Sequence, residues 1–257
     1  MGTQAYTSTH NLNLLFEFSK VHFKLKYKHS YLYFLWHIIN PLILFGVLYI
    51  LFSKNIGLNI ENYPLYVLIG VIHWHFFNVA TSDSTRTFWF FLDIVKKTNA
   101  NRLIMVLGVI LSCFYSYLIE FIILSLIICF TIGLSWTAAL VIYIFILELL
   151  LVTSIALIFS VLYSYFGDVE YMWKNILFFG WFLTPIIYSK DIIPTNISFI
   201  WKFNPLYYIL NFSRDLLIYG KIPNFSAVIL FTFILILSIL ISYYIFNKLV
   251  ENIAGRI

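Results

Sequence analysis

The chain has 257 residues, of which 62% are hydrophobic and only 11% are charged. Ordinary water-soluble domains carry about a quarter charged residues, so this composition excludes a soluble globular protein. The charges gather in short clusters between long apolar runs, which indicates that most of the protein lies in lipid. The formal net charge of +5 is better explained by anionic lipid headgroups than by nucleic acid.

Residues 11–29 form the first expected element, and they carry one apolar and one basic face. The apolar positions recur at helical spacing, at Leu14, Phe18, Val21 and Leu25. The lysines follow every four residues, at Lys20, Lys24 and Lys28. This pattern predicts a helix lying in the membrane interface. Residues 21–28 also alternate with period 2, but a lone strand would leave its edges unpaired, which favours the helix.

Six apolar runs follow, and each is a candidate for a helix that crosses the membrane, which needs about 20 residues. They cover residues 32–52, 63–81, 103–133, 136–166, 171–188 and 225–247. The runs are apolar on every face, whereas the strands of a membrane barrel alternate. We therefore predict an all-α integral membrane protein with six transmembrane helices, forming a single domain over residues 1–257.

Residues 82–102, between the second and third runs, are longer and more charged than a simple connector. Their ionisable residues are Asp83, Arg86, Asp93, Lys96, Lys97 and Arg102. Two interpretations stay open, because such a segment serves either as a solvated anchor on the cytoplasmic side or as a docking helix for a soluble partner.

Residues 189–223, before the last run, belong to a stretch that prolines break into short apolar pieces. The prolines are Pro185, Pro194, Pro205 and Pro223. None of the pieces is long enough to span the bilayer comfortably, so we predict re-entrant or interfacial helices. A path through the bundle could open here.

The distribution of lysine and arginine predicts the orientation. With the N-terminus in the cytoplasm, eleven of the 16 basic residues lie on the cytoplasmic side. The other side then holds Lys54, Lys190, Lys202, Arg214 and Lys221. We therefore expect a multi-pass protein of the cytoplasmic membrane with both termini in the cytoplasm.

Motifs for catalysis are absent from the sequence. Gly220-Lys221 is the only Gly-Lys pair, and it lacks the other residues of a phosphate-binding loop, so the chain should carry no ATP site of that type. Cys113 and Cys129 lie about 24 Å apart along one expected helix and cannot bond to each other. We predict no catalytic residue, no metal site and no cofactor.

Four ionisable side chains fall inside the expected spans. Glu120 and Glu148 could line a pathway or relay a proton, but hydrogen bonding across a helix interface explains them equally well, and we favour this structural role. His73 and His75 point about 200° apart on a helix, so they cannot easily share a metal ion and are interpreted as structural.

Aromatic residues make up 21% of the chain, more than two interfacial belts require. Aromatic faces also pack against the C–H faces of sugar rings, so some of these side chains could line a path along which a glycan slides.

The sequence resembles the membrane subunit of ABC-2 type exporters for surface polysaccharides, the group that handles O-antigen, capsule and teichoic acid. The resemblance rests on short stretches in a matching order along nearly the whole chain. They are Lys26-Tyr27-Lys28 with Ser30, Leu35-Trp36, Asn40-Pro41-Leu42, Gly70 with Trp74, Lys96-Lys97-Thr98, Thr184-Pro185-Ile186-Ile187-Tyr188, Ile193-Pro194, Asn204-Pro205-Leu206 and Arg214-Asp215.

This resemblance implies a homodimer of six-helix subunits and a separate nucleotide-binding subunit that hydrolyses ATP. It implies a cytoplasmic coupling helix within residues 82–102, and the expected coupling residues are Asp93, Lys96, Lys97 and Arg102. It implies external gate helices within residues 189–223. A lipid-linked glycan would pass between the two permeases, and the side chains expected along its path are Trp36, Trp74, Phe77, Trp181, Phe182 and Tyr188.

The sequence departs from the family pattern in three places. Ala100-Asn101-Arg102 stands where Phe-Pro-Arg is usual, Phe166-Gly167-Asp168 replaces Phe-Arg-Asp, and His73 replaces a common proline. The missing arginine puts in doubt any charge contact carried over to the loop at Gly167.

We therefore predict a permease that exports an O-antigen-like, lipid-linked polysaccharide. The alternatives within transport are teichoic acid, capsule, or a small amphiphile or drug. A membrane transferase acting on lipid-linked sugars is the alternative from another class, and Asp168 with Glu170 is its only close acidic pair.

Overall fold

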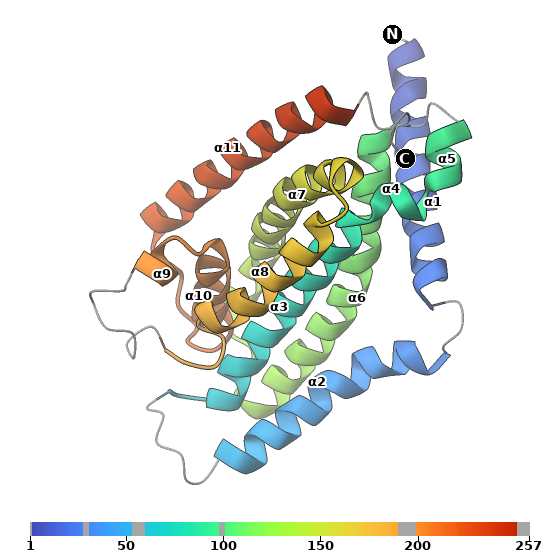
Figure 1. Ribbon diagram of the computed structural model, residues 1–257. Helices are drawn as coiled ribbons and strands as arrows, with labels where there is room; N and C mark the ends of the chain where they lie inside the picture. Colours follow the sequence, from blue (N-terminus) through green and yellow to red (C-terminus); the bar gives the residue numbers. More distant parts are fainter. Residues whose placement is uncertain (1, 28–30, 53–59, 98–100, 190–198, 251–257) are drawn as a thin grey trace.

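The computed structural model describes residues 2–27, 31–52, 60–97, 101–189 and 199–250, and all regular elements in these ranges are helices (Figure 1). In chain order they are α1 (Gly2–Tyr27), α2 (Tyr31–Phe52), α3 (Tyr63–Thr85), α4 (Thr87–Phe90), α5 (Leu92–Lys97), α6 (Arg102–Thr131), the 3₁₀ helix η1 (Trp136–Leu140), α7 (Val141–Tyr165), α8 (Val169–Leu183), α9 (Phe199–Lys202), α10 (Pro205–Leu217) and α11 (Phe225–Val250).

Four helical stretches of this described part are long and apolar enough to cross a membrane. They are Tyr63–Thr85, Arg102–Thr131, Trp136–Tyr165 and Phe225–Val250. The prediction of an all-α membrane protein is thereby confirmed. The total of six spans stays a prediction.

Helices α3, α6 and α7 form the centre of the bundle. The other long helices are arranged around them: α1 runs along α6, α11 along α7, and α8 packs against α3 and α7. Figure 1 shows α2 and α11 on opposite sides of this centre. Large apolar side chains of the central helices are fully buried, including Leu68, Met105 and Leu157, so the core has the close packing that excludes both water and lipid.

Helix α1 lies unusually close to α6. A Cβ atom built on Gly108 would stand 2.7 Å from Cβ of Phe18, so only glycine permits this approach. Phe18 is buried, and its ring meets Phe91 edge-on with centroids 5.0 Å apart. Residues 21–27 are helical, which agrees with the helix favoured over a strand, and the helix begins at Gly2 instead of residue 11. Residues 28 and 29 of the expected element lie outside the described residues. Its place in the membrane interface stays a prediction.

The expected fifth span, residues 171–188, is helical only over Val169–Leu183. The helix ends early because a residue that precedes proline avoids the helical conformation, and Thr184, before Pro185, is extended with ψ 130°. A helix of 15 residues is about 22 Å long, which is shorter than the hydrocarbon core.

The two loop segments contain short helices at opposite ends of the bundle (Figure 1). In the segment 82–102, the first residues complete α3, and α4 and α5 follow at the end where α1 begins. In the segment 189–223, α9 and α10 lie at the other end, while residues 190–198 lie outside the described residues.

Candidate functional site

A cavity of about 710 Å³ opens between α2, α3, α6 and α8. Helix α8 contributes one face, at the helical spacing i, i+3, i+4, i+7 and i+8, through Lys174, Leu177, Phe178, Trp181 and Phe182. Helix α3 contributes a second face, through Leu68, Val71, Ile72, Trp74, His75 and Asn78. The cavity is therefore the space between two helices that each turn a continuous stripe toward it.

Aromatic rings form much of the wall between these two helices. Trp74 and Trp181 meet edge-on with centroids 5.6 Å apart, and Phe178 and Phe182 do the same at 5.6 Å. Gly180 permits the close packing of α8 on α3, since a Cβ atom there would lie 3.1 Å from the Trp74 ring. These edge-on contacts hold the rings in the wall, in which Trp74 is buried whereas Phe178 and Phe182 are exposed.

The same cavity holds five polar side chains, namely Asn40, His75, Asn78, Glu120 and Lys174. Nδ1 of His75 lies 3.0 Å from a carboxylate oxygen of Glu120. The lining thus combines amides, an imidazole, a carboxylate and an ammonium group with tryptophan and phenylalanine rings, which is typical of pockets that orient a polar ligand by a few hydrogen bonds.

A second histidine–glutamate pair lies deeper in the bundle. Nδ1 of His73 is 2.7 Å from Oε2 of Glu148, and the hydroxyl of Tyr117 donates to the same oxygen at 2.8 Å. All three side chains are buried. Within the described part of the chain, Nε2 of His73 and Oε1 of Glu148 have no hydrogen-bond partner. This network ties α3, α6 and α7 together, in agreement with the structural role favoured for Glu148.

Arg214 of α10 anchors the chain that follows α8. Its guanidinium donates to three backbone oxygens: that of Tyr66 at 3.2 Å, and those of Pro185 and Ile186, each at 2.9 Å. The group also stacks 3.4 Å above the Tyr66 ring. Gly70 leaves room for it, because a Cβ atom at this position would lie 2.9 Å from Nη2 of Arg214.

Asn204 strengthens the same corner of the molecule. Its Oδ1 accepts from the N–H of Leu206 at 3.0 Å and caps α10, whose first residue is Pro205. Its Nδ2 donates to Oγ1 of Thr184 at 2.8 Å. Gly70, Thr184, Asn204 and Arg214, which carry part of the family resemblance, are thus one packed unit that holds α3, α8 and α10 together.

The segment 82–102 presents a charged outer surface over an apolar base. Phe88 and Val95 are buried, whereas Lys96 is exposed and Trp89 keeps 53% of its surface. Lys97 and Asp93 are both exposed and form an ion pair of 3.5 Å. Arg102 differs from the other expected coupling residues, because it donates to the carbonyl of Val250 at 3.0 Å and so holds the end of α11.

Glu170 connects Arg86, which follows the last residue of α3, to Lys174 in the cavity lining. It lies 3.4 Å from Nε of Arg86 and 2.6 Å from Nζ of Lys174. The hydrogen bond from Lys174 lowers the pKa of Glu170, which keeps this carboxylate charged. A carboxylate that two cations keep ionised is unsuited to act as the general acid that a transferase would need.

The expected path residues separate into two groups. Trp74, Trp181 and Phe182 line the cavity. Phe77 lies with Trp74 beside a second hollow of about 470 Å³, Trp36 is half exposed on α2, and the hydroxyl of Tyr188 donates to the carbonyl of Phe182 at 2.7 Å.

Sequence reasoning anticipated only part of the polar lining. Glu120 was considered as a pathway residue and Asn40 belonged to a stretch of the family resemblance, whereas Asn78 carried no signal and Lys174 counted only as a basic residue. The helical spacing of Asn78 with His75 and the apolar positions of α3 could have revealed its place in the lining.

Comparison with known proteins agrees with this architecture. Residues 14–218 match the family model described as ABC-2 type transporter. Two proteins of Klebsiella pneumoniae, each named O-antigen export system permease protein RfbA, are 29% and 30% identical, over 93% of this chain and 95% of their own length. A Myxococcus xanthus protein of the same name is 21% identical over 78% of both chains. The chain therefore belongs to the ABC-2 type transporter family of membrane permeases.

Proposed function

We propose that this chain is the transmembrane subunit of an ABC transporter that exports a lipid-linked, O-antigen-like polysaccharide across the cytoplasmic membrane. The observation that carries the proposal is the cavity between α3 and α8, whose lining includes both aromatic rings and polar side chains. The names of the relatives point to the same class of cargo.

The chemistry of the lining suits a glycan. Rings such as Trp181 and Phe182 offer flat apolar faces to the C–H faces of sugars, and such contacts do not fix a register along a chain. Asn40, Asn78 and His75 supply donors and acceptors for hydroxyl groups. Lys174 supplies a positive charge at the end near Glu170, which is suited to the phosphate of a lipid carrier.

A second copy of the chain is expected to complete the path. Phe178, Phe179 and Phe182 of α8 are each more than 60% exposed. A cluster of rings on one helix indicates contact with lipid or with another subunit. We expect two permeases to face each other across this side, so that the open mouth of each cavity contributes to a shared channel.

ATP hydrolysis is assigned to a separate subunit, because the sequence has no phosphate-binding loop. The exposed face formed by Trp89, Asp93, Lys96 and Lys97 is the expected docking surface for it. The apolar residues beneath this face pack on α1 and α6. A movement of the docked ATPase would therefore be transmitted to these helices.

The proposal is tested with the matched variants Trp181→Ala and Trp136→Ala. Trp136 is 71% exposed and does not belong to the cavity lining. Loss of one aromatic contact of about 0.5–1.5 kcal/mol corresponds to a loss of about 2-fold to 10-fold in glycan affinity. Trp181→Ala should therefore reduce surface glycan and glycan-stimulated ATPase activity, while Trp136→Ala should leave both unchanged.

Protein level and assembly with the ATPase must be equal in both variants for the comparison to count. Equal export by the two variants would refute a role of the cavity in the path. If the purified complex responds instead to teichoic acid, to capsule precursor or to a small amphiphile, the cargo is that alternative.

A further inference from the structure

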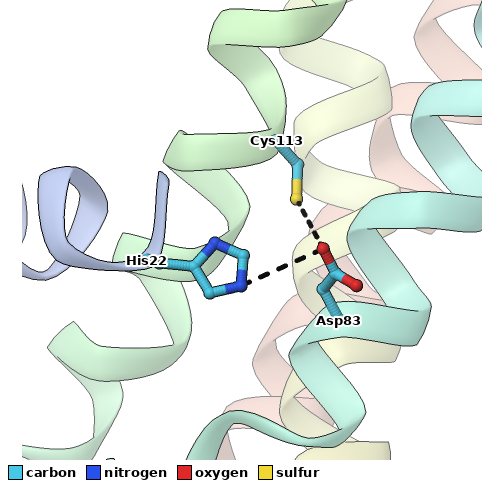
Figure 2. Close-up of side chains that lie close together, drawn as sticks. All are labelled: His22, Asp83 and Cys113. Atoms are coloured by element: carbon cyan, nitrogen blue, oxygen red, sulfur yellow. Dashed lines mark hydrogen bonds and ion pairs between the residues drawn. The ribbon is translucent and has the colours of Figure 1, made fainter. Parts of the chain in front are cut away.

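Three potential metal ligands from three different helices meet where α1 crosses the cytoplasmic half of the bundle. They are His22 of α1, Asp83 of α3 and Cys113 of α6, and Figure 2 shows their side chains pointing toward one another. One ligand atom from each lies within 4.8 Å of those of the other two. The three residues are far apart in the sequence, so no short motif predicts that they come together.

The spacing of the three ligand atoms is close to that of a tetrahedral zinc site. Nε2 of His22 is 3.9 Å from Oδ2 of Asp83, and Sγ of Cys113 is 3.6 Å from the same oxygen. The ligand atoms of His22 and Cys113 lie within 4.8 Å of each other. Zinc bonds of about 2.0–2.3 Å place tetrahedral ligands about 3.3–3.8 Å apart, so shifts of up to about 1 Å would enclose an ion.

The imidazole of His22 is already held in the orientation that a metal requires. Its Nδ1 lies 3.0 Å from Oγ of Ser112, so the hydroxyl fixes the ring and Nε2 faces the carboxylate. Metal-bound histidines are usually oriented in this way through their second nitrogen.

Lys26 competes for this position. Its ammonium group is 2.7 Å from Oδ2 of Asp83. The side chains of Lys26 and Asp83 keep 20% and 24% exposure, so the lysine can swing into solvent and an ion has a route to the carboxylate. Without a metal ion, the ammonium group of Lys26 supplies the positive charge beside Asp83.

We propose that His22, Asp83 and Cys113 form a site for a divalent cation of the zinc class, with Lys26 as its displaceable counterion. On binding, Nε2, a carboxylate oxygen and the thiolate become ligands, and water completes the shell. The thiol proton passes to solvent, and the Lys26 ammonium leaves the carboxylate. The ion ties α1 to α3 and α6. This inference does not depend on the nature of the exported cargo.

The test uses the full chain, purified in detergent, stripped with chelator and then titrated with Co²⁺ and Zn²⁺. Cobalt reports thiolate ligation through its charge-transfer absorption, and zinc retained after dialysis is measured by mass spectrometry. The expected result is one ion per chain with a cobalt–thiolate band. Cys129→Ser, which removes the exposed cysteine, should change neither measurement.

Variants of the ligands and of the residues around them should then differ in metal affinity in a defined order. Cys113→Ser should abolish the cobalt–thiolate band, and His22→Ala should weaken zinc binding at least tenfold. Ser112→Ala keeps all three ligands but releases the imidazole, so we expect a loss of about 10-fold to 100-fold. Lys26→Met removes the competitor and should tighten binding. Unfolding of each metal-free variant is measured to show that it is folded.

Three outcomes would overturn the proposal. The first is the absence of stoichiometric binding by the parent protein, including the case in which only Lys26→Met binds, since the lysine then excludes the ion. The second is equal zinc affinity of the parent and Cys113→Ser. The third is loss of the signal in Cys129→Ser, which would place the metal at the other cysteine.

Discussion

Replacing Arg214 tests whether the packed unit around it stabilises the fold. The variant Arg214→Met keeps most of the side-chain volume but removes every donor. Three backbone oxygens, those of Tyr66, Pro185 and Ile186, would then lose their hydrogen bonds from the buried guanidinium. Hydrogen bonds to a charged group contribute about 1.5–3 kcal/mol each, so the gross loss is about 4.5–9 kcal/mol.

Part of this loss is offset, because the variant no longer buries a charge, which costs several kcal/mol. We expect a net fall of about 3 kcal/mol in the free energy of unfolding. For a chain of this size that corresponds to a fall in Tm of roughly 6–12 °C. Circular dichroism of the detergent-solubilised protein during heating measures it.

Arg86→Met is the matched control. Arg86 is 53% exposed and pairs with Glu170 at 3.4 Å, and such surface pairs contribute at most about 1 kcal/mol. If Arg214→Met does not accumulate in membranes, Arg214→Lys keeps the charge but not the planar fork, so an intermediate fall is expected. A Tm of Arg214→Met within about 2 °C of the parent would refute the reasoning.

Three further predictions concern helix packing, the buried network and coupling. Gly108→Ala should push α1 from α6 and cost about 1–3 kcal/mol, measured as a fall in Tm, whereas Gly46→Ala, which meets nothing within 4 Å, should cost far less. Tyr117→Phe should lower the free energy of unfolding by about 1–3 kcal/mol, because it takes a donor from a buried carboxylate. The double variant Lys96→Glu with Lys97→Glu should insert normally but weaken copurification of the ATPase and its coupled turnover.

Each of these predictions has a result that contradicts it. Equal Tm values for the two glycine variants would mean that the close approach of α1 to α6 does not constrain the fold. Tyr143→Phe is the control, because the Tyr143 hydroxyl is exposed. If it lowered the free energy of unfolding as much as Tyr117→Phe does, burial of the Tyr117 hydroxyl would not explain the loss. Lys202→Glu with Lys221→Glu carries the same charge change at the opposite end of the molecule, so equal loss of coupling there would count against docking at Lys96 and Lys97.

The sequence was a good guide wherever local patterns decide structure. Hydrophobic length predicted α6, α7 and α11, and helical spacing predicted that residues 21–27 form a helix instead of a strand. The role of Pro185 was underestimated, because the apolar run continues past it while its ring forces Thr184 out of the helix.

Long-range packing was beyond the reach of sequence patterns. Arg214 was counted among the basic residues outside the membrane, yet it is only 3% exposed and binds three carbonyl oxygens. Histidines and glutamates were recognised singly, but which carboxylate each histidine meets depends on the rotation of α3 against α6 and α7. The cluster of His22, Asp83 and Cys113 depends in the same way on where α1 crosses the bundle.

Helix α8 is held at both of its ends, and this has a mechanical consequence. Glu170 binds Arg86 near its start, and Arg214 holds the carbonyl groups just beyond its end. A helix that is held at two points resists translation along its axis but can still rotate about that axis. We expect α8 to rotate in this way and to move its aromatic rings into or out of the cavity. Spin labels at Phe178 and Asn40 would separate on ATP binding if it rotates, and a constant distance between them would exclude this motion.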